Sequence, residues 1–345
     1  MPLEFEAIDA ESGEFGYTED KYGPLLGRFN DILDHHETGE LSDAKYLAAL
    51  QELLAQAPDF IDAHTQIAFH WHRQGKPKKA LDAALAGLAM ANRQIPPGFT
   101  GRIEWLNIDN RAYLRMMHVA VLAYVRLRRH RDAAALIEQM LLRNPNDNQG
   151  VRFLLGSELQ RIDPYGGTLE QRERVIAVCA EHAGTYPPYW YELALAHLHR
   201  ERWVAAATAL RRGFVTNPYV AEILGGNPEP MPHMAWHPDD TTLPDAAKDY
   251  VASYGALWGC HPAHILFVHW LFNHPEVLVE RASVMACREA LLWETDPGKR
   301  GEILVRVDEL TARIDDSLSA AIVVQRETVG RRLVWPWELQ LTLLD

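Results

Sequence analysis

Apolar residues recur along most of the chain at spacings of three and four, the pattern of one buried face of an α-helix. From about residue 43 onward, long segments rich in Ala and Leu follow this pattern, and short breaks that contain Pro or Asn separate them. The alternating pattern typical of strands is nearly absent. The sequence therefore predicts an all-α protein.

Three of these segments share one spacing of large and small residues. Counted from His64, Met117 and Trp190, packing residues fall at positions 0, +3, +4, +7, +16, +20 and +23, and Asn or Pro follows at +28. Small residues let two antiparallel helices approach closely, and large residues fill the space between them. Pro ends the second helix because it cannot continue the hydrogen-bond ladder. The spacing predicts a series of stacked helix pairs.

This spacing resembles the tetratricopeptide repeat, a helix–turn–helix unit of 34 residues. The unit from Trp190 to Pro218 matches best, with its leading Trp and its closing Pro. The offsets between units require an inserted loop at Ile95–Asn107 and an enlarged turn at Asp163–Gly167. The resemblance implies a tetratricopeptide-like solenoid of helical hairpins.

A narrower resemblance covers roughly residues 58–258. The segments Asn110–Arg115 and Asn144–Leu155 are similar to bacterial repeat proteins related to the suppressor-of-tumorigenicity-seven family and to SEC-C-associated repeat proteins. Asn217–Gly226 and a helix at Asp245–Trp258 fit the end of the same module. The clustered Cys and His of the SEC-C motif are missing, so its zinc role is not implied here. The resemblance implies an interaction protein without a defined reaction.

Four segments follow from this interpretation. They are an acidic N-terminal arm at 1–42, tetratricopeptide-like repeats at 43–224, a linker and capping helix at 225–258, and an additional C-terminal helical bundle at 259–345. Residues 1–20 carry seven acidic residues and no basic one, which favours a solvated, flexible terminus. The alternation in Leu3–Ile8 leaves open a short edge strand, or an arm that orders against the body.

The C-terminal tail Leu333–Leu344 is aliphatic and contains two Trp residues. We expect it to fold back as a cap over the last helix pair, which a solenoid otherwise leaves exposed. The alternative is an interface for a partner or for a second copy of the chain. A homo-oligomer through the C-terminal region is therefore a possible assembly.

The charge balance narrows the choice of partners. The 34 Lys and Arg residues against 47 Asp and Glu residues leave a formal net charge of −13. This argues against nucleic acid, which needs excess basic residues, and against an anionic membrane. No apolar stretch approaches the roughly 18–20 residues of a membrane span, and neither a disulfide framework nor a secretory signal is recognisable. We expect a cytoplasmic protein.

Motifs for catalysis are absent, so we expect neither an enzyme nor a cofactor. The chain contains no nucleophile elbow, no HExxH and no glycine-rich phosphate loop. The densest group of possible metal ligands is Cys260, His261 and His264, followed by His269 and His274. Zinc usually takes three or four convergent ligands. The alternative function is thus a metal-dependent protein or enzyme that uses this His-rich C-terminal region, although we expect packed or surface histidines and no metal.

The best candidate site is the concave groove of the solenoid, which the first helix of each pair lines. Two arginines there could hold a carboxylate of an acidic segment. Alternatively, both arginines bond inter-helix carbonyls or turn carboxylates, or the acidic N-terminal arm occupies the groove. The predicted groove residues are Phe69, His72, Arg115, His118, Gln149, Arg152, Tyr191 and His199.

The sequence thus predicts a non-enzymatic scaffold or adaptor that binds a peptide or protein segment in this groove. A toxin-neutralising or secretion-accessory protein is a further alternative, in which the acidic surface mimics an acidic ligand.

Overall fold

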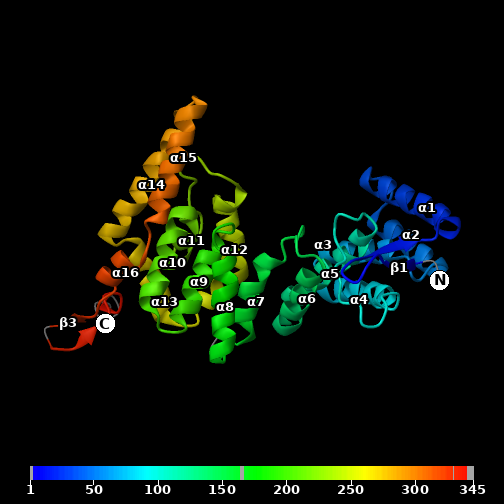
Figure 1. The fold of residues 1–345 in the computed structure, drawn as a ribbon, viewed down its shortest axis with the longest axis horizontal. Coiled ribbons are helices and arrows are strands. Elements are labelled where there is room, and N and C mark those ends of the chain that lie inside the picture. Colours follow the sequence, from blue (N-terminus) through cyan, green and yellow to red (C-terminus); the bar gives the residue numbers. More distant parts are fainter. Residues whose placement is uncertain (1–2, 164–166, 329, 340–345) are drawn as a thin grey trace. The chain divides into compact units, whose positions relative to one another are not determined.

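The computed structural model describes residues 3–163, 167–328 and 330–339. Within these ranges the chain forms sixteen α-helices, one short 3-10 helix and four short strands, which confirms the predicted all-α class. The chain divides into two compact units, Met1–Glu158 and Leu159–Asp345, and the division falls within one helix. Figure 1 shows the helices of each unit in chain order.

Unit 1 begins with a β-hairpin and continues as a series of helices. Within it, each of the helices α1 to α5 packs on the next one along the chain. The elements are β1 (Leu3–Ala7), β2 (Gly13–Tyr17), α1 (Glu19–Glu37), α2 (Asp43–Gln56), α3 (Ile61–Arg73), α4 (Pro77–Asn92), α5 (Asn110–Arg126), α6 (His130–Arg143) and most of α7 (Arg152–Ile162). The gap between α4 and α5 contains the predicted inserted loop.

Unit 2 takes up the end of α7 and contains the remaining helices. Proline occupies the first turn of α9 and of α12 to α15, where a missing N–H leaves no bond unmade. The elements are α8 (Leu169–His182), α9 (Pro188–Leu198), α10 (Trp203–Thr216), α11 (Tyr219–Leu224), η1 (Asp240–Thr242), α12 (Pro244–Trp258), α13 (Pro262–Phe272), α14 (Pro275–Trp293), α15 (Pro297–Ala312), α16 (Asp316–Ile322), β3 (Arg326–Glu327) and β4 (Leu333–Val334). Most of the predicted turn at 163–167 lies outside the described residues.

Glycine marks the closest approach in two of the helix pairs. A methyl group added to Gly87 of α4 would lie 2.7 Å from Cβ of His64 in α3. One added to Gly213 of α10 would lie 3.3 Å from Cβ of Trp190 in α9. In both pairs the two residues are the 0 and +23 positions of the predicted spacing. The close approach predicted at the small positions is therefore present in both pairs.

The N-terminal segment is ordered, so the expectation of a flexible, solvated terminus is wrong. Strand β1 pairs antiparallel with β2, and Leu3 and Phe15 are buried. The backbone N–H of Phe15 donates to Oδ1 of Asn110 at the start of α5, 2.9 Å away. The alternation of apolar and polar residues in this segment predicts the hairpin, whereas its acidic composition does not. The apolar face of the hairpin packs on the rest of unit 1. The segment also differs from an arm lying in the groove, since none of the predicted groove residues holds it.

The inserted loop also contacts this hairpin. The N–H of Arg102 donates to the carbonyl of Glu11, and the N–H of Gly13 donates to the carbonyl of Arg102 at 3.0 Å. Phe99 packs edge-on against Phe5, with ring centroids 5.1 Å apart. The loop and the N-terminal strands therefore stabilise each other.

The core of unit 2 contains a buried polar network around Glu192 of α9, whose side chain is fully buried. The hydroxyl of Tyr250 in α12 donates to Oε1 of Glu192 over 2.7 Å, and Nε1 of Trp258 donates to that hydroxyl over 3.1 Å. Burial and the Glu192 charge raise the pKa of Tyr250 well above its usual range, so the phenol keeps its proton. The network fixes α12 against α9.

The described part of the C-terminal tail folds back onto unit 2, but its buried tryptophan packs on α10 and α13, whereas the prediction placed the tail over the last helix pair. The side chain of Trp337 is fully buried. Its ring centroid lies 4.9 Å from that of Trp203 in α10 and 4.6 Å from that of Phe267 in α13. The rest of the tail, 340–345, lies outside the described residues.

No helix in the described part of the chain combines the length and apolar character needed to cross a membrane.

We predict that Asn110→Ala weakens the packing of the β1–β2 hairpin on α5. Asn110 is buried, and its side chain bonds the backbone of Phe15, Gly13 and Glu104. Leaving buried backbone groups without partners costs about 1–3 kcal/mol each. Hydrogen exchange of the β1 and β2 amides should accelerate at least tenfold. The exposed Asn148→Ala serves as the control, and equal protection in both variants would contradict this account of the hairpin.

Candidate functional site

In unit 1 the structure brings together two predicted groove residues, His72 near the end of α3 and His118 in α5. Burial lowers the pKa of both imidazoles, and each is half-buried. The positive charge of Arg126 lowers the pKa of His72 further, whereas Asp147 acts in the opposite direction on His118. Both rings are therefore neutral near pH 7 and can donate or accept a hydrogen bond.

Two further groove residues of unit 1 are half-buried, Phe69 in α3 and Gln149 before α7. Neither the amide nitrogen nor the amide oxygen of Gln149 has a hydrogen-bond partner among the described residues, although both atoms are buried. Nδ1 of His72 is in the same condition. Buried polar atoms are usually paired with protein, water or a ligand.

Arg152 has a structural role at the start of α7. Its Nε donates to Oδ2 of Asp147 over 2.9 Å, and its Nη2 donates to the carbonyl of Pro145 over 2.8 Å. The Asp147 carboxylate also accepts the backbone N–H groups of Val151 and Arg152. The alternative in which this arginine bonds a turn carboxylate is therefore the one observed. The guanidinium of Arg152 therefore stabilises the turn before α7 and is not assigned to a ligand.

Arg115 of α5 lies over an aromatic ring. Its guanidinium carbon is 5.3 Å from the ring centroid of Trp105, and Arg111 stacks on the same indole at 5.2 Å. Its charge also acts on the buried carboxyl of Asp62, whose pKa burial raises. The two predicted groove arginines thus differ, because Arg115 is held by a ring and Arg152 by a carboxylate.

Tyr191 is not a surface residue, which corrects its assignment to the groove. Its side chain is fully buried in the core of unit 2, and its hydroxyl donates to the carbonyl of Asn217 over 2.6 Å. Its ring also meets the face of α10 at Gly213, where the lack of a side chain makes room. The ring fills the space between α9 and α10 and is not available to a ligand.

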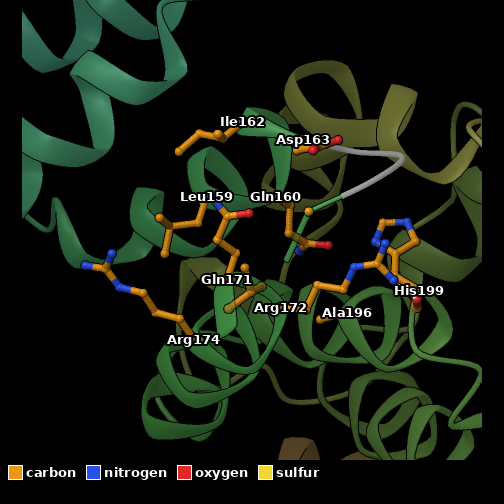
Figure 2. A pocket seen from close by; sticks show the side chains of 11 residues that line it. Leu159, Gln160, Ile162, Asp163, Gln171, Arg172, Arg174, Ala196 and His199 are labelled. Atoms are coloured by element: carbon orange, nitrogen blue, oxygen red, sulfur yellow. Dashed lines mark hydrogen bonds between the residues drawn. The ribbon is translucent and has the colours of Figure 1, made fainter. Parts of the chain in front are cut away.

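The last predicted groove residue, His199, caps the C-terminal end of α9 and lines a hollow in unit 2. We call this the α7–α9 hollow because α7, α8 and α9 form its walls (Figure 2). Its volume is about 110 Å³, which is smaller than a usual small-molecule site and has room for about one side chain. Its lining is mostly apolar and includes Leu159, Ile162, Val175 and Ala196.

One end of the α7–α9 hollow is cationic. Figure 2 shows the guanidinium of Arg172 beside His199, and its Nη1 donates to the carbonyl of His199. This bond leaves other N–H groups of the fork directed elsewhere, because a guanidinium has five. Next to Arg172, Glu173 pairs with Arg200 at 2.5 Å and with Arg202 at 2.6 Å, and these charges lower its pKa. The pairs fix α8 against the turn after α9 and so position Arg172.

The hollow also contains an unsatisfied acceptor. Gln160 of α7 is buried, and its Nε2 donates to the Glu192 carboxylate in the core. Its Oε1 has no partner among the described residues. Nε2 of His199 is likewise buried without a partner. The arrangement thus combines an apolar wall with Arg172, Arg174, Asp163 and two polar atoms without a partner, and no described residue that lines it is a nucleophile paired with a base.

Sequence analysis missed Arg172 and Gln160. Arg172 belongs to α8, the second helix of its pair, whose side chains were not expected to line the groove. The sequence contained one indication of this site. The distance from Tyr124 to His197 is five residues longer than two repeats, and the helices that form the hollow lie in this interval.

A second hollow shares Arg172 and His199 with the first and continues to the start of α13. There the ring centroid of His264 lies 5.4 Å from that of His199 and 5.0 Å from that of His261. The structure thus joins two of the C-terminal histidines to α9 and not to His269 or His274. No group of three His, Cys, Asp or Glu side chains in the described ranges is arranged to hold a metal ion.

Comparison with known proteins places the chain in no family: no protein-family model matches it, and no curated protein matches it significantly.

We predict that the buried histidines make unit 2 sensitive to acid. Burial lowers the pKa of His199 to about 4 and that of His264 to about 3, against 6.5 in an unfolded chain. The unfolded state therefore binds more protons below pH 6.5, and the free energy of unfolding falls as the pH drops from 6.5 towards 4. The slope is about 1.4 kcal/mol per pH unit for each histidine.

Hydrogen exchange of the α13 amides, corrected for intrinsic rates, measures this slope. His264→Gln should lower the slope by about 1.4 kcal/mol per pH unit, and His199 and the other histidines of unit 2 whose pKa burial lowers supply the rest. His35→Gln, at a side chain 54% exposed, is the control and should leave it unchanged. A slope that is the same in the wild type and in His264→Gln would contradict the burial of a neutral imidazole here.

Proposed function

We propose that the protein is a non-enzymatic interaction protein that binds a peptide segment in the α7–α9 hollow. The observation that carries the proposal is the composition of this hollow, an apolar wall with two arginines, Arg172 and Arg174, one carboxylate, Asp163, and two polar atoms that have no partner among the described residues. The segment would contribute an apolar side chain to the wall and a carboxylate to Arg172. A carboxylate bound to a guanidinium forms charge-assisted bonds, which are the stronger kind.

The polar atoms support a peptide over a small apolar molecule. Oε1 of Gln160 accepts hydrogen bonds, and the backbone N–H groups of an extended segment would supply them. The neutral ring of His199 can either donate or accept, and so can pair with an N–H or with a carbonyl. In unit 1, His72 near the end of α3 and Gln149 in the turn before α7 have the same kind of unpaired atoms.

The proposed architecture is a tetratricopeptide-like solenoid related to the repeat proteins named above. The equivalent glycine contacts in the α3–α4 and α9–α10 pairs support it, because unrelated helix pairs have no reason to share the 0 and +23 positions. The cytoplasmic location and the lack of nucleic-acid binding stay predictions from sequence.

Selection of peptides from a random library displayed on phage, with the full chain as bait, tests the proposal. We expect enrichment of peptides in which Asp or Glu lies near an apolar residue. Fluorescence polarisation of an enriched peptide should then show a Kd at least tenfold weaker for Arg172→Ala, since a charge-assisted hydrogen bond contributes about 1.5–3 kcal/mol. The exposed Arg28→Ala, on α1, is the matched control and should bind like the wild type.

Circular dichroism shows whether Arg172→Ala keeps its helices. Arg172→Lys keeps the positive charge but loses the forked guanidinium. Its Kd for the peptide should therefore lie between those of the wild type and of Arg172→Ala. Failure to enrich any peptide, or equal affinity in a folded Arg172→Ala variant, would refute binding in this hollow.

A further inference from the structure

The hairpin of α14 and α15 carries an apolar stripe that nothing in the described chain covers. Val279 and Trp293 of α14 are 65% and 73% exposed, and the small residues Ala282, Ala286 and Ala290 between them are exposed as well. These five residues are three or four apart, so they lie on one face of the helix. The buried residues of α14, Val277, Val284 and Leu291, lie on the opposite face. An indole this exposed is typical of an interaction surface.

A row of charges of alternating sign runs along α15 beside this stripe. Lys299, Glu302, Arg306 and Glu309 are all exposed, and they too are three or four residues apart. Glu302 and Arg306 line one shallow hollow together with Ala286 and Ala290 of α14. The charged row and the apolar stripe therefore form one continuous face, which we call the hairpin face. Figure 1 shows the two helices side by side.

The charges of this row complement each other when α15 lies antiparallel to a copy of itself. With the centre at position 304, Lys299 faces Glu309 of the second copy and Glu302 faces Arg306. All four facing pairs across the two copies are then opposite in sign, and no like charges meet. A row with this symmetry suits a two-fold interface, in which each residue meets its counterpart about one axis.

The same axis produces a matching arrangement on α14. Arg300 donates to the carbonyl of Leu291, so these positions lie at about the same level. Position 304 is then level with 287, because both helices rise about 1.5 Å per residue. An antiparallel copy of α14 centred there sets Trp293 level with position 281 of the other chain, one residue from Ala282, so the large side chain lies beside a small one on the exposed stripe. It also brings the two Cys287 residues together near the axis.

We propose that the hairpin face is the interface of a homodimer with two-fold symmetry, with α14 antiparallel to α14 and α15 antiparallel to α15. Helix α14 has 19 residues and is about 28 Å long. Two helices side by side, each about 10 Å wide, present about 550 Å² per chain, or about 1,100 Å² in total. This is close to the lower limit for specific interfaces, and we expect a dimer with a micromolar Kd.

Sedimentation velocity of the full chain, from about 1 µM to about 200 µM, brackets a micromolar Kd and tests the proposal. The wild type should shift from monomer to dimer over this range. Trp293→Ala should weaken the dimer at least tenfold. The exposed Leu142→Ala in unit 1 is the control and should behave like the wild type.

Charge reversal tests the register. Glu302→Arg should abolish the dimer because it sets a positive charge against Arg306 of the second copy, where the wild type has a negative one. Combining it with Arg306→Glu should restore the dimer, since the pairs are again opposite in sign. Both sites are exposed, and circular dichroism verifies that the variants fold.

A short bis-maleimide tests the position of the axis in a Cys260→Ser background. It should link two Cys260→Ser chains through Cys287. Adding Cys287→Ser should abolish the cross-linked dimer. A chain that stays monomeric at every concentration, or a dimer that Trp293→Ala and Glu302→Arg leave intact, would overturn the proposal.

Discussion

Two helix pairs of this protein are closed by a contact that leaves no room for a side chain. Gly87 lies against His64 between α3 and α4, and Gly213 lies against Trp190 and Tyr191 between α9 and α10. A glycine inside a helix weakens it, so its presence there has to be offset by the packing it permits. Farther along the first helix of each pair, His72 near the end of α3 and His199 after α9 are half-buried.

Buried polar groups decide where unit 2 can bind a ligand. Glu192 is fully buried and takes hydrogen bonds from Gln160 and Tyr250, which ties α7, α9 and α12 together. This orientation of Gln160 leaves its Oε1 without a partner at the wall of the hollow. Arg172 is positioned in a similar way, since its bond to the carbonyl of His199 and the ion pairs of Glu173 fix its helix. The buried hydrogen bonds of the core therefore also position the residues that line the α7–α9 hollow.

The local pattern of the sequence was enough to predict the helices and the close approach within pairs, because both depend on residues near one another in the chain. The N-terminal hairpin could not be predicted with the same certainty, since the partner of Phe15 is Asn110, 95 residues away. Arg152 was expected as a ligand-binding cation, yet Asp147 in the preceding turn binds it. Tyr191 was assigned to the surface, although glycine at 213 opens space for its ring in the core. Arg172 was missed because its contact is with a different helix pair.

The most direct test of the paired-helix account compares two glycines of unit 1. Gly87 and Gly27 are both inside helices, but nothing lies within 4 Å of a methyl group added to Gly27. Alanine favours helix by about 0.5–1 kcal/mol over glycine, so Gly27→Ala should raise the free energy of unfolding by that amount. Gly87→Ala should instead lower it by about 1–3 kcal/mol, because the methyl group overpacks the contacts with Sδ of Met116 in α5 and Cβ of His64 in α3. Urea denaturation measures both. If Gly87→Ala stabilises the protein as Gly27→Ala does, the close contact between the helices does not exist.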